Sequence, residues 1–492
     1  MRLQVLADVL AEIDAHLEVS PGCGELEISA LSADSRAIEP GGLFAALPGA
    51  KADGSRFVAE AVARGAVAVL ARHGANITVP DAIALLRTQE PRQALARLAA
   101  RFYAPPPGTI VAVTGTSGKT SVADFARQIF ARLGHCAASL GTLGVVKAGA
   151  ATYGALTTPD PVTLHQTLAR LAQDGITHLA MEASSHGLDQ HRLDGVVLRA
   201  AAFTNLGRDH LDYHPSMAAY LAAKLRLFQE LLPREGTAVI NADAAQAVAA
   251  IAAAEQAGRR VFSVGMAGTG LQLLHQSPRG FAQDLRVRCG ADIRAIRLPL
   301  LGDYQANNAL LAAGLVMACG AASGEALGAL EHLAGVKGRL EIVGQVRGGL
   351  IVIDYAHKPD ALAAALRALK PFAPGRLVCL FGCGGDRDKG KRPIMGQIAN
   401  ELAGSVIITD DNPRNENPAA IRAEILAGAP GAREIGDRQE AIRAGMRLLG
   451  NGDVLLIAGK GHETGQIVGS IVKPFSDHEA VRVALAEAPL NA

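Results

Sequence analysis

The chain has 492 residues and a net charge of +1, and 49% of its residues are hydrophobic but only 4% aromatic. This length predicts roughly two to four domains. The near-zero charge gives no support for nucleic-acid binding, because nucleic-acid-binding domains usually carry a basic surplus. The longest apolar run, residues 309–322, is shorter than the ~20 residues of a membrane span. We therefore expect no membrane span, and a buried helix in this run.

The first residues and the cysteines both favour a reduced, cytoplasmic enzyme. Acidic residues interrupt positions 1–19, where a signal peptide would need an apolar stretch. The six cysteines lack the spacing of a disulfide framework or a zinc site. Cys379 and Cys383 lie in or beside an apolar run, so we expect them to be small buried side chains.

A proline-rich segment divides the chain. Residues 104–108, Ala-Pro-Pro-Pro-Gly, cannot continue a helix and are predicted to be a linker. Before it, the runs 42–47 and 66–71 are typical of short strands. We therefore predict a first domain over residues 1–104.

Beyond the linker, apolar runs alternate with helical patterns, which is typical of parallel sheets covered by helices. The central strands are predicted to end at Ser117, Glu182, Asn205 and Asn241. After a break near residues 335–338, further strands are predicted at 350–354, 377–381, 406–409 and 454–457. The fold class is therefore α/β, with domains predicted at 108–336 and 337–492. Because ligands bind at the carboxyl ends of parallel strands, the residues after each run are candidates for a site.

The clearest motif follows the apolar run 109–113. Residues 115–120, Gly-Thr-Ser-Gly-Lys-Thr, form a glycine-rich turn before a helix predicted to begin at Lys119. Such a turn offers backbone N–H groups to phosphate, while Lys119 can reach the β- and γ-phosphates and the Thr120 hydroxyl can bind Mg²⁺. Val113 stands where a full Walker A motif has glycine, so the loop is a shortened variant. The motif predicts ATP binding.

Three further residues of the central region are candidates, and two of them, Glu182 and His210, have two interpretations each. Glu182 can complete a Mg²⁺ site with Thr120, or cap a turn at its strand end. His210 can be a second metal ligand or a helix-capping histidine. Lys224 lies in a predicted helix over residues 220–228, where a solvated surface lysine is the ordinary expectation.

In the last region, residues 382–385 suggest a dinucleotide-binding turn, but Arg387 stands where its third glycine would be. Four cations close together form either an anion site or a solvated basic loop: Arg387, Lys389, Lys391 and Arg392. In the run Asp411-Asn412-Pro413-Arg414, the proline stiffens the turn and is expected to direct Arg414 outward, where its guanidinium can bind a carboxylate through two hydrogen bonds. Glu463, which follows the flexible run that begins at Gly459, can pair with an ammonium. Together these residues suit an amino-acid zwitterion.

Nearly the whole chain carries motifs in one order: 34–36, 114–120, 157–159, 182–188, 204–206, 209–212, 354–357, 385–392, 411–414 and 459–463. With this set the chain resembles the Mur ligases, and within them those that add meso-diaminopimelate to UDP-N-acetylmuramoyl-L-alanyl-D-glutamate. The resemblance implies three domains: a UDP-binding domain, a central ATPase and a Rossmann-like domain for the amino acid. It also implies a cytoplasmic monomer that uses ATP and Mg²⁺ and forms an acyl phosphate, which the incoming amine attacks.

The resemblance also implies residue roles. Lys119, Lys224 and His210 are expected to be catalytic. The expected ATP contacts are Gly115, Thr116, Ser117, Gly118, Lys119, Thr120, Ser121, Asn308, Arg339 and Asp354. The expected metal ligands are Thr120, Glu182, His210 and Lys224, the last as a carbamate. The expected contacts of the UDP-linked peptide are Ser35, Thr157, Thr158, Ser184, Gln190 and Arg192. The expected diaminopimelate contacts are Arg387, Asp411, Asn412, Pro413, Arg414, Gly459 and Glu463.

Arg414 carries the expected choice of amino acid, because diaminopimelate has a distal carboxylate that lysine lacks. Three alternatives stay open: a lysine-adding Mur ligase, a folylpolyglutamate synthetase-like ligase and, from another class, a P-loop ATP-binding switch without ligase chemistry. Ser117, Leu156 and Gln305 each stand where the family usually has asparagine, and Ala50-Lys51 replaces a more polar pair.

Overall fold

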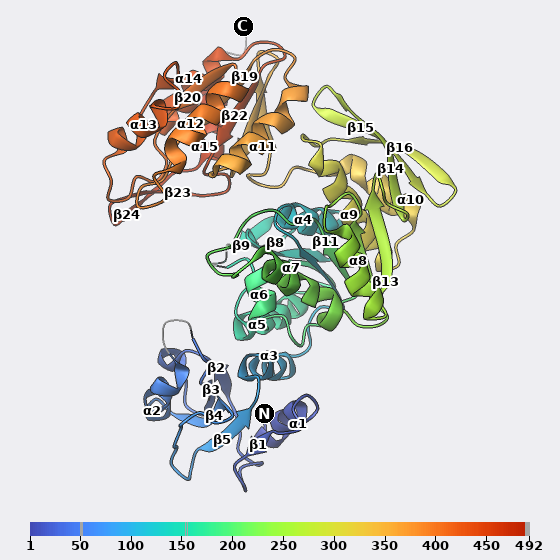
Figure 1. Ribbon diagram of the computed structural model, residues 1–492, viewed down its shortest axis with the longest axis vertical. Coiled ribbons are helices and arrows are strands. Elements are labelled where there is room, and N and C mark those ends of the chain that lie inside the picture. Colours follow the sequence, from blue (N-terminus) through green and yellow to red (C-terminus); the bar gives the residue numbers. More distant parts are fainter. Residues whose placement is uncertain (50–52, 153, 155, 488–492) are drawn as a thin grey trace. The chain divides into compact units, whose positions relative to one another are not determined.

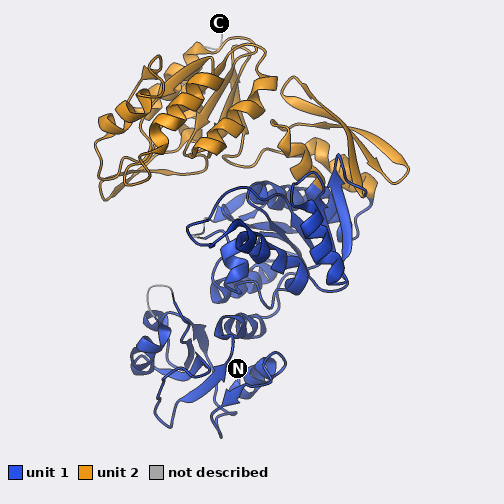
Figure 2. Cartoon of the chain, in the orientation of Figure 1, with its two compact units in different colours: residues 1–269, 311–322 blue, residues 270–310, 323–492 orange. Residues whose placement is uncertain are grey.

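The structure is a computed structural model that describes residues 1–49, 53–152, 154 and 156–487. Ala50 and Lys51 therefore lie outside the described residues. The chain divides into two compact units, Met1–Thr269 with Leu311–Ala322, and Gly270–Leu310 with Ser323–Ala492 (Figure 2). Each unit is described separately below.

Unit 1 begins with a five-stranded sheet in the order β1-β5-β4-β3-β2 (Figure 1). Its strands are β1 (Glu18–Val19), β2 (Ala30–Ser32), β3 (Gly42–Ala45), β4 (Ala66–Arg72) and β5 (Ala84–Thr88), and its helices are α1 (Leu3–Ala11), α2 (Val58–Ala63) and α3 (Pro91–Phe102). Every residue of β3 is buried, as expected for a parallel strand covered on both faces. Leu43 packs in one core and Phe44 in the other, so the two predicted strands here are confirmed.

In the second, eleven-stranded sheet, the strands that belong to unit 1 have the order β13-β12-β11-β6-β10-β7-β8-β9. The strands are β6 (Thr109–Thr114), β7 (Ala137–Gly141), β8 (Gly144–Lys147), β9 (Ala150–Thr152), β10 (His178–Glu182), β11 (Ala200–Phe203), β12 (Thr237–Asn241) and β13 (Arg260–Gly265). The helices are α4 (Lys119–Arg132), α5 (Pro161–Gln173), α6 (Ser185–Asp189), α7 (Met217–Arg226) and α8 (Ala247–Gln256). The strands from β13 to β7 are parallel, and β8 and β9 are antiparallel. The carboxyl ends of β6, β10 and β11 therefore meet at one edge.

Unit 2 contains three strands that pair antiparallel with one another, β14 (Leu271–Arg279), β15 (Ala282–Cys289) and β16 (Asp292–Leu298). Its larger sheet has the order β17-β18-β22-β19-β20-β21. Those strands are β17 (Glu341–Val346), β18 (Gly349–Asp354), β19 (Leu377–Phe381), β20 (Ser405–Ile408), β21 (Arg433–Glu434) and β22 (Val454–Ala458). The helices are α10 (Ser323–Ala329), α11 (Pro359–Leu369), α12 (Lys391–Leu402), α13 (Pro418–Leu426), α14 (Arg438–Leu448) and α15 (Asp477–Glu487), and a hairpin joins β23 (Gly465–Val468) to β24 (Ile471–Pro474).

Helices cover both faces of the larger sheet of unit 2 (Figure 1). Along β19, Cys379 and Phe381 pack in the core that α11, α12 and α13 share, whereas Val378 and Leu380 pack in the core of α14 and α15. Strands β18, β22, β19 and β20 are parallel neighbours, so their carboxyl ends share one edge. The predicted α/β class, with helices over parallel sheets, is confirmed.

Several details depart from the expected boundaries. The strand predicted to end at Ser117 ends at Thr114, because Gly115 turns the chain with a φ of 146°. Residues 309–318 of the apolar run 309–322 lie in helix α9 (Tyr304–Ala318), and Ala309 to Ala313 are buried, as predicted. In the described part of the chain, no helix is long and apolar enough to cross a membrane.

The cysteines behave as expected. All six are free thiols. Cys379 and Cys383 are buried, which raises the pKa of the first to about 12 and of the second to about 11.

Candidate functional site

The glycine-rich turn after β6 has a backbone that only glycine adopts easily. Gly115 and Gly118 have φ values of 146° and 86°. A Cβ on Gly115 would lie 1.8 Å from Thr204 Oγ1, so the loop passes too close to β11 for any side chain. Helix α4 begins at Lys119, as predicted, and its N-terminus follows the turn directly. The loop and helix therefore present N–H groups as an anion site would require.

The end of β11 holds this loop in place. Thr204 Oγ1 donates to Ser117 O at 2.6 Å, and Ser117 N donates to Asn205 Oδ1 at 3.0 Å. Thr116 N donates to Asn205 O at 2.9 Å. The sequence placed Thr204 and Asn205 at a strand end but assigned them no role. Two signals pointed to them: their position at a strand end and their place in the motif at 204–206.

Two lysines converge on one carbonyl of the loop. Lys119 Nζ lies 2.9 Å from Gly115 O, and Lys224 Nζ lies 2.8 Å from the same oxygen. Lys224 has only 1% of its surface exposed, so the expectation of a solvated lysine is wrong. Burial, and next the charge of Lys119, lower the pKa of Lys224 to about 6. Its amine is therefore largely neutral at pH 7.

Tyr220 joins Lys224 to the loop. Lys224 Nζ lies 4.4 Å from the centre of the Tyr220 ring, and the phenol oxygen lies 3.1 Å from Thr116 Oγ1. Tyr220 was missed in the sequence, although it precedes Lys224 by one helical turn on α7, a spacing that puts two side chains on one face.

Glu182 ends β10, beside the phosphate loop, because the parallel register pairs it with Val113 of β6. Its buried carboxylate accepts from Thr142 N at 2.7 Å and from Thr142 Oγ1 at 3.3 Å. A Cβ on Gly141 would lie 2.1 Å from Glu182 Oε1, so glycine is required there. The turn-capping interpretation is thus confirmed, and the role as a metal ligand stays a prediction.

His210 lies in the loop after β11 with a φ of 54°. Its backbone N donates to Asp209 Oδ1 at 2.9 Å, and its ring stands 4.9 Å from that of His186. No cluster of three or more His, Cys, Asp or Glu side chains suited to a metal occurs among the described residues. The expected ligand set is not of this kind, since it also draws on the Thr120 hydroxyl and on Lys224.

Five of the six residues expected to bind the UDP-linked peptide form one hydrogen-bonded group. Arg192 donates to Thr158 O at 2.7 Å and to Gln190 Oε1 at 2.8 Å. Thr158 Oγ1 accepts from Ser184 N at 3.0 Å and donates to Glu182 O at 3.0 Å. Burial lowers the pKa of Arg192. The group thus begins at the strand end that carries Glu182.

Thr157 and Ser35 are the other two residues expected to bind the UDP-linked peptide. Thr157 Oγ1 is 3.0 Å from Thr142 Oγ1, and the half-exposed Leu156 precedes it. Ser35 begins a short 3-10 helix (Ser35–Ala37) in the N-terminal part of unit 1, and its hydroxyl donates to Glu60 Oε2 at 3.0 Å. The structure therefore joins Thr157 to the group but leaves Ser35 in the N-terminal part.

Three expected nucleotide contacts lie in unit 2. Asp354, at the end of β18, accepts from Leu340 N and Ala356 N, both at 2.8 Å, and burial raises its pKa while Arg339 opposes the shift. Arg339 stands 5.2 Å from the Tyr355 ring centre. In α9, Asn308 Nδ2 donates to Gln305 Oε1 at 2.9 Å. Gln305, at 1% exposed, therefore fixes the amide of Asn308.

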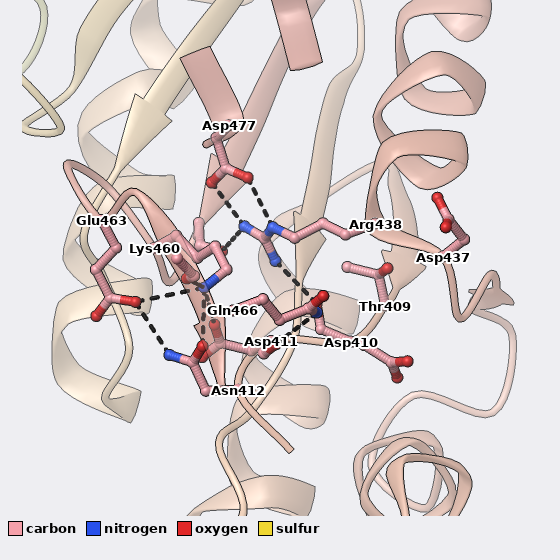
Figure 3. Close-up of polar contacts among 12 residues, drawn as sticks. Thr409, Asp410, Asp411, Asn412, Asp437, Arg438, Lys460, Glu463, Gln466 and Asp477 are labelled. Carbon is pink, nitrogen blue, oxygen red and sulfur yellow. Dashed lines mark hydrogen bonds and ion pairs between the residues drawn. The ribbon is translucent and has the colours of Figure 1, made fainter. Parts of the chain in front are cut away.

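Several of the residues predicted to bind the amino-acid substrate lie where β22 and β20 end (Figure 3). Asn412 Nδ2 donates to Glu463 Oε2 at 3.0 Å. Gly459, with a φ of 110°, turns the chain between β22 and Glu463. Asp411 Oδ1 is buried and accepts no hydrogen bond from the described residues. Its ion-pair partner is Lys460, whose Nζ lies 3.4 Å away, so the ammonium of an incoming amino acid could supply the hydrogen bond that this oxygen lacks.

Arg414 has a backbone fixed independently of its side chain. Its N donates to Ile467 O at 3.0 Å and its O accepts from Gly469 N at 2.7 Å. Its Nη1 donates to Gly385 O at 2.8 Å. A Cβ on Gly384 would lie 2.8 Å from Arg414 Nη1 and 3.8 Å from Arg387 Cγ, so the two arginines flank one glycine. Pro413 also approaches closely, because a Cβ on Gly385 would lie 1.9 Å from its carbonyl oxygen.

The structure does not support an anion site made of the four cations Arg387, Lys389, Lys391 and Arg392. Arg392 is fully buried between Glu416, at 3.0 Å, and Glu424, at 2.8 Å. Lys389 pairs with Glu416 at 3.2 Å, and Lys391 Nζ donates to His357 O at 2.7 Å. The interpretation as a four-residue anion site is wrong, because all four cations have partners within the chain: Arg387 Nη1 also donates to a backbone oxygen, Asp386 O, at 3.2 Å.

Comparison with known proteins gives three family models in chain order. "Mur ligase family, catalytic domain" matches residues 27–103, "Mur ligase middle domain" matches 113–316, and "Mur ligase, glutamate ligase domain" matches 338–461. Among curated proteins, the UDP-N-acetylmuramoyl-L-alanyl-D-glutamate--2,6-diaminopimelate ligase of Bradyrhizobium diazoefficiens is 57% identical over 96% of this chain and 97% of its own. The ligase of the same description from Agrobacterium fabrum is 56% identical over 94% of each chain.

Solved structures agree. One described as the same 2,6-diaminopimelate ligase matches with a TM-score of 0.75 and 32% identity over 99% of both chains. MurF from Acinetobacter baumannii matches with a TM-score of 0.61 and 20% identity over 98% of both, which shows the fold alone. The predicted three-domain α/β architecture is thereby confirmed. The chain belongs to the Mur ligase family.

Proposed function

We propose that this chain is an ATP-dependent ligase of peptidoglycan precursor synthesis. It joins meso-2,6-diaminopimelate to the D-glutamate of UDP-N-acetylmuramoyl-L-alanyl-D-glutamate through an acyl phosphate. Relatives described by this activity are 54–57% identical over more than nine tenths of the chain. The observation that carries the proposal is the fixed Arg414 guanidinium at the sheet edge that also bears Asp411, Asn412 and Glu463.

The three domains are proposed as 1–104 for the UDP end, 108–336 for ATP and 337–492 for the amino acid. The three family models, at 27–103, 113–316 and 338–461, support these boundaries. The residues proposed to activate the acid lie in unit 1 and those proposed to bind the amino acid lie in unit 2.

The loop from Gly115 to Ser121 is proposed to hold the phosphates of ATP. Its cradle would be filled by any Cβ at Gly115, and Lys119 already lies against the loop carbonyls. When ATP binds, the Lys119 ammonium can move its hydrogen bond from a loop carbonyl to a phosphate oxygen. There it would offset the negative charge that develops on the phosphates. Asn308, Arg339 and Asp354 of unit 2 are proposed as further nucleotide contacts.

The donor set at the same edge fits Mg²⁺. Thr120 and Glu182 offer a hydroxyl and a carboxylate, and Mg²⁺ prefers a few such oxygens together with phosphate and water. His210 and Lys224 are proposed to hold a second ion. When bound, Mg²⁺ would neutralise charge on the transferred phosphoryl group.

Lys224 is proposed to be carbamylated. Its pKa of about 6 leaves the amine neutral, and a neutral amine can attack CO₂. The new N–C bond costs the nitrogen one proton, which leaves to water, and the product is a carbamate anion. A buried neutral amine beside Lys119 thus becomes an anion, which attracts the Lys119 ammonium and supplies oxygen ligands.

The hydrogen-bonded group around Arg192 is proposed to bind the UDP-linked peptide, with Thr157, Thr158, Ser184 and Gln190, and with Ser35 at the UDP end. Arg192 is the cation of this group and suits the carboxylates of the peptide. Phosphorylation of the D-glutamate carboxylate supplies the leaving group that a free carboxylate lacks. The amine then attacks, and ADP, phosphate and the new amide result.

At the other edge, Arg414 with Arg387 is proposed to bind the distal carboxylate of diaminopimelate, and Glu463 with Asp411 and Asn412 its ammonium. This disfavours a lysine-adding enzyme, because lysine has no distal carboxylate. Folylpolyglutamate synthase from Mycobacterium tuberculosis matches 75% of the chain at 19% identity, a likeness of fold alone. A P-loop ATP-binding switch without ligase chemistry would not need a second charged sheet edge that binds an amino acid.

A ligation assay that offers diaminopimelate, lysine and ornithine in parallel tests the proposal. We expect amide product with diaminopimelate, and at least tenfold lower efficiency with the other two. Equal use of lysine would refute the assignment. A cytoplasmic location and a monomeric state are further proposals, which fractionation and light scattering would test.

A further inference from the structure

Lys460, which no comparison or motif assigns a role, is a fully buried cation in unit 2. Its exposed surface is 0%, although an ammonium away from water is costly unless it is paired. Its Nζ donates to Gly465 O at 2.7 Å and to Asn412 Oδ1 at 3.0 Å, and it lies 3.4 Å from both Asp411 Oδ1 and Glu463 Oε2 (Figure 3). All four partners are oxygens of the proposed amino-acid edge or of the hairpin beside it.

Lys460 fixes which way the Asn412 amide points. Asn412 Oδ1 accepts from Lys460 Nζ and from Ile467 N, both at 3.0 Å. With two donors on the oxygen, the NH₂ group must face the other way, where Nδ2 donates to Glu463 Oε2 at 3.0 Å. Without the ammonium, one of the two contacts that set this orientation is lost.

Lys460 also sets the charge of the edge. It stands between two carboxylates, Asp411 and Glu463, so the three side chains together carry one net negative charge. One negative charge matches one ammonium of an amino acid. Because Glu463 Oε2 is held by Asn412 and Lys460, the other oxygen, Oε1, is left for a ligand.

The same nitrogen connects this site to Arg414. Gly465, whose carbonyl accepts from Lys460, begins strand β23, and Ile467 of that strand accepts from Arg414 N at 3.0 Å. Lys460 therefore contacts the groups that face an ammonium and the strand that fixes the arginine.

The strand ends that carry these groups are themselves clamped. Arg438 donates from Nη2 to Ala458 O at 3.0 Å, at the end of β22, and pairs with Asp477 at 2.7 Å and 2.8 Å. Lys460 follows Ala458, the last residue of β22, by only two positions. Its position is therefore set by the sheet and not by a mobile loop.

We propose that Lys460 is a positioning residue for the second substrate: it orients Asn412 and Glu463 and leaves one net negative charge to select the ammonium of the incoming amino acid. This inference rests on the proposed function, since the amino acid is the one assigned there. Lys460 does not touch the reacting atoms, so it acts on amino-acid binding and not on ATP.

The test is the variant Lys460→Met in the full chain. We expect the KM for diaminopimelate to rise tenfold or more, with the KM values for ATP and the UDP-linked peptide within about twofold of wild type. In a double-mutant cycle with Glu463→Gln, the effect of Lys460→Met should fall to less than threefold, because its partner is already altered. Lys473→Met, which removes an exposed lysine from β24 of the same hairpin, is the matched control and should change nothing.

An unchanged or lowered KM for diaminopimelate would overturn the inference, as would equal losses for all three substrates or full additivity with Glu463→Gln. If Lys460→Met fails to fold, Lys460→Gln gives the answer, since its amide can still donate to Asn412 and Gly465 without the charge. A KM within twofold of wild type in that variant would refute the role of the charge. Wild-type protein that fails to ligate diaminopimelate would instead refute the proposed function.

Discussion

Replacing Arg414 with alanine isolates the contact proposed to distinguish diaminopimelate from lysine. The backbone of residue 414 is held by hydrogen bonds to Ile467 and Gly469, which do not involve the side chain. Alanine also meets the same positive φ of 50° that arginine does, so the substitution adds no new backbone strain. The effect should therefore be confined to the guanidinium.

The size of the effect follows from the donors that remain. Nη1 already donates one hydrogen bond to Gly385 O, and the rest of the fork can grip a carboxylate. A hydrogen bond to a charged group contributes about 1.5–3 kcal/mol. Because the side chain is only half-buried, we take about 2–3 kcal/mol for the whole contact. At 1.4 kcal/mol per factor of ten, the KM for diaminopimelate should rise about 30- to 150-fold.

Steady-state kinetics with diaminopimelate and with lysine measure this directly. The preference for diaminopimelate over lysine should fall by the same factor, since lysine presents no carboxylate to the lost group, and the KM for ATP should stay constant. A preference that survives the substitution, or an equal loss with both amino acids, would show that Arg414 does not read the distal carboxylate.

Three other perturbations test the remaining parts of the structure. Gly115→Ala should abolish ADP binding in calorimetry, because its Cβ has no space, whereas Gly431→Ala, with nothing within 4 Å, should bind normally. Lys224 has a folded pKa of about 6 against 10.5 when exposed, so the unfolded state binds more protons between these values. Across that range the free energy of unfolding should increase more steeply with pH in wild type than in Lys224→Met, and equal slopes in urea titrations would contradict the burial. Arg438→Met should lose about 3–5 kcal/mol of stability by leaving a buried partner unpaired, whereas Arg443→Met, from an exposed pair on the same helix, should lose under about 1 kcal/mol.

The parts of the fold that the sequence predicted are those set by local pattern. The helix start at Lys119 and the strand end at Glu182 follow from a glycine-rich turn and from an apolar run that stops at a charge. The strand predicted at 377–381 appears as β19 with the same bounds, because an unbroken apolar run is typical of a strand buried on both faces.

What could not be predicted depends on partners far along the chain. Lysine and arginine are rarely fully buried unless they are paired, yet Lys460 is buried beside Asp411 and Arg392 beside Glu416, both carboxylates distant in the sequence. Lys224 is buried by packing that its own helix does not reveal. Gly141 has no motif, and its requirement comes from a glutamate 41 residues later. Side-chain pairing across a sheet edge is a tertiary property, so only the structure exposes it.

The most direct measurement is phosphate release from ATP, followed together with the mass of the product. We predict that phosphate appears only when the UDP-linked dipeptide and diaminopimelate are both present, with one amide formed for each phosphate. Phosphate release when the UDP-linked dipeptide or diaminopimelate is left out, or turnover with no amide product, would contradict the account.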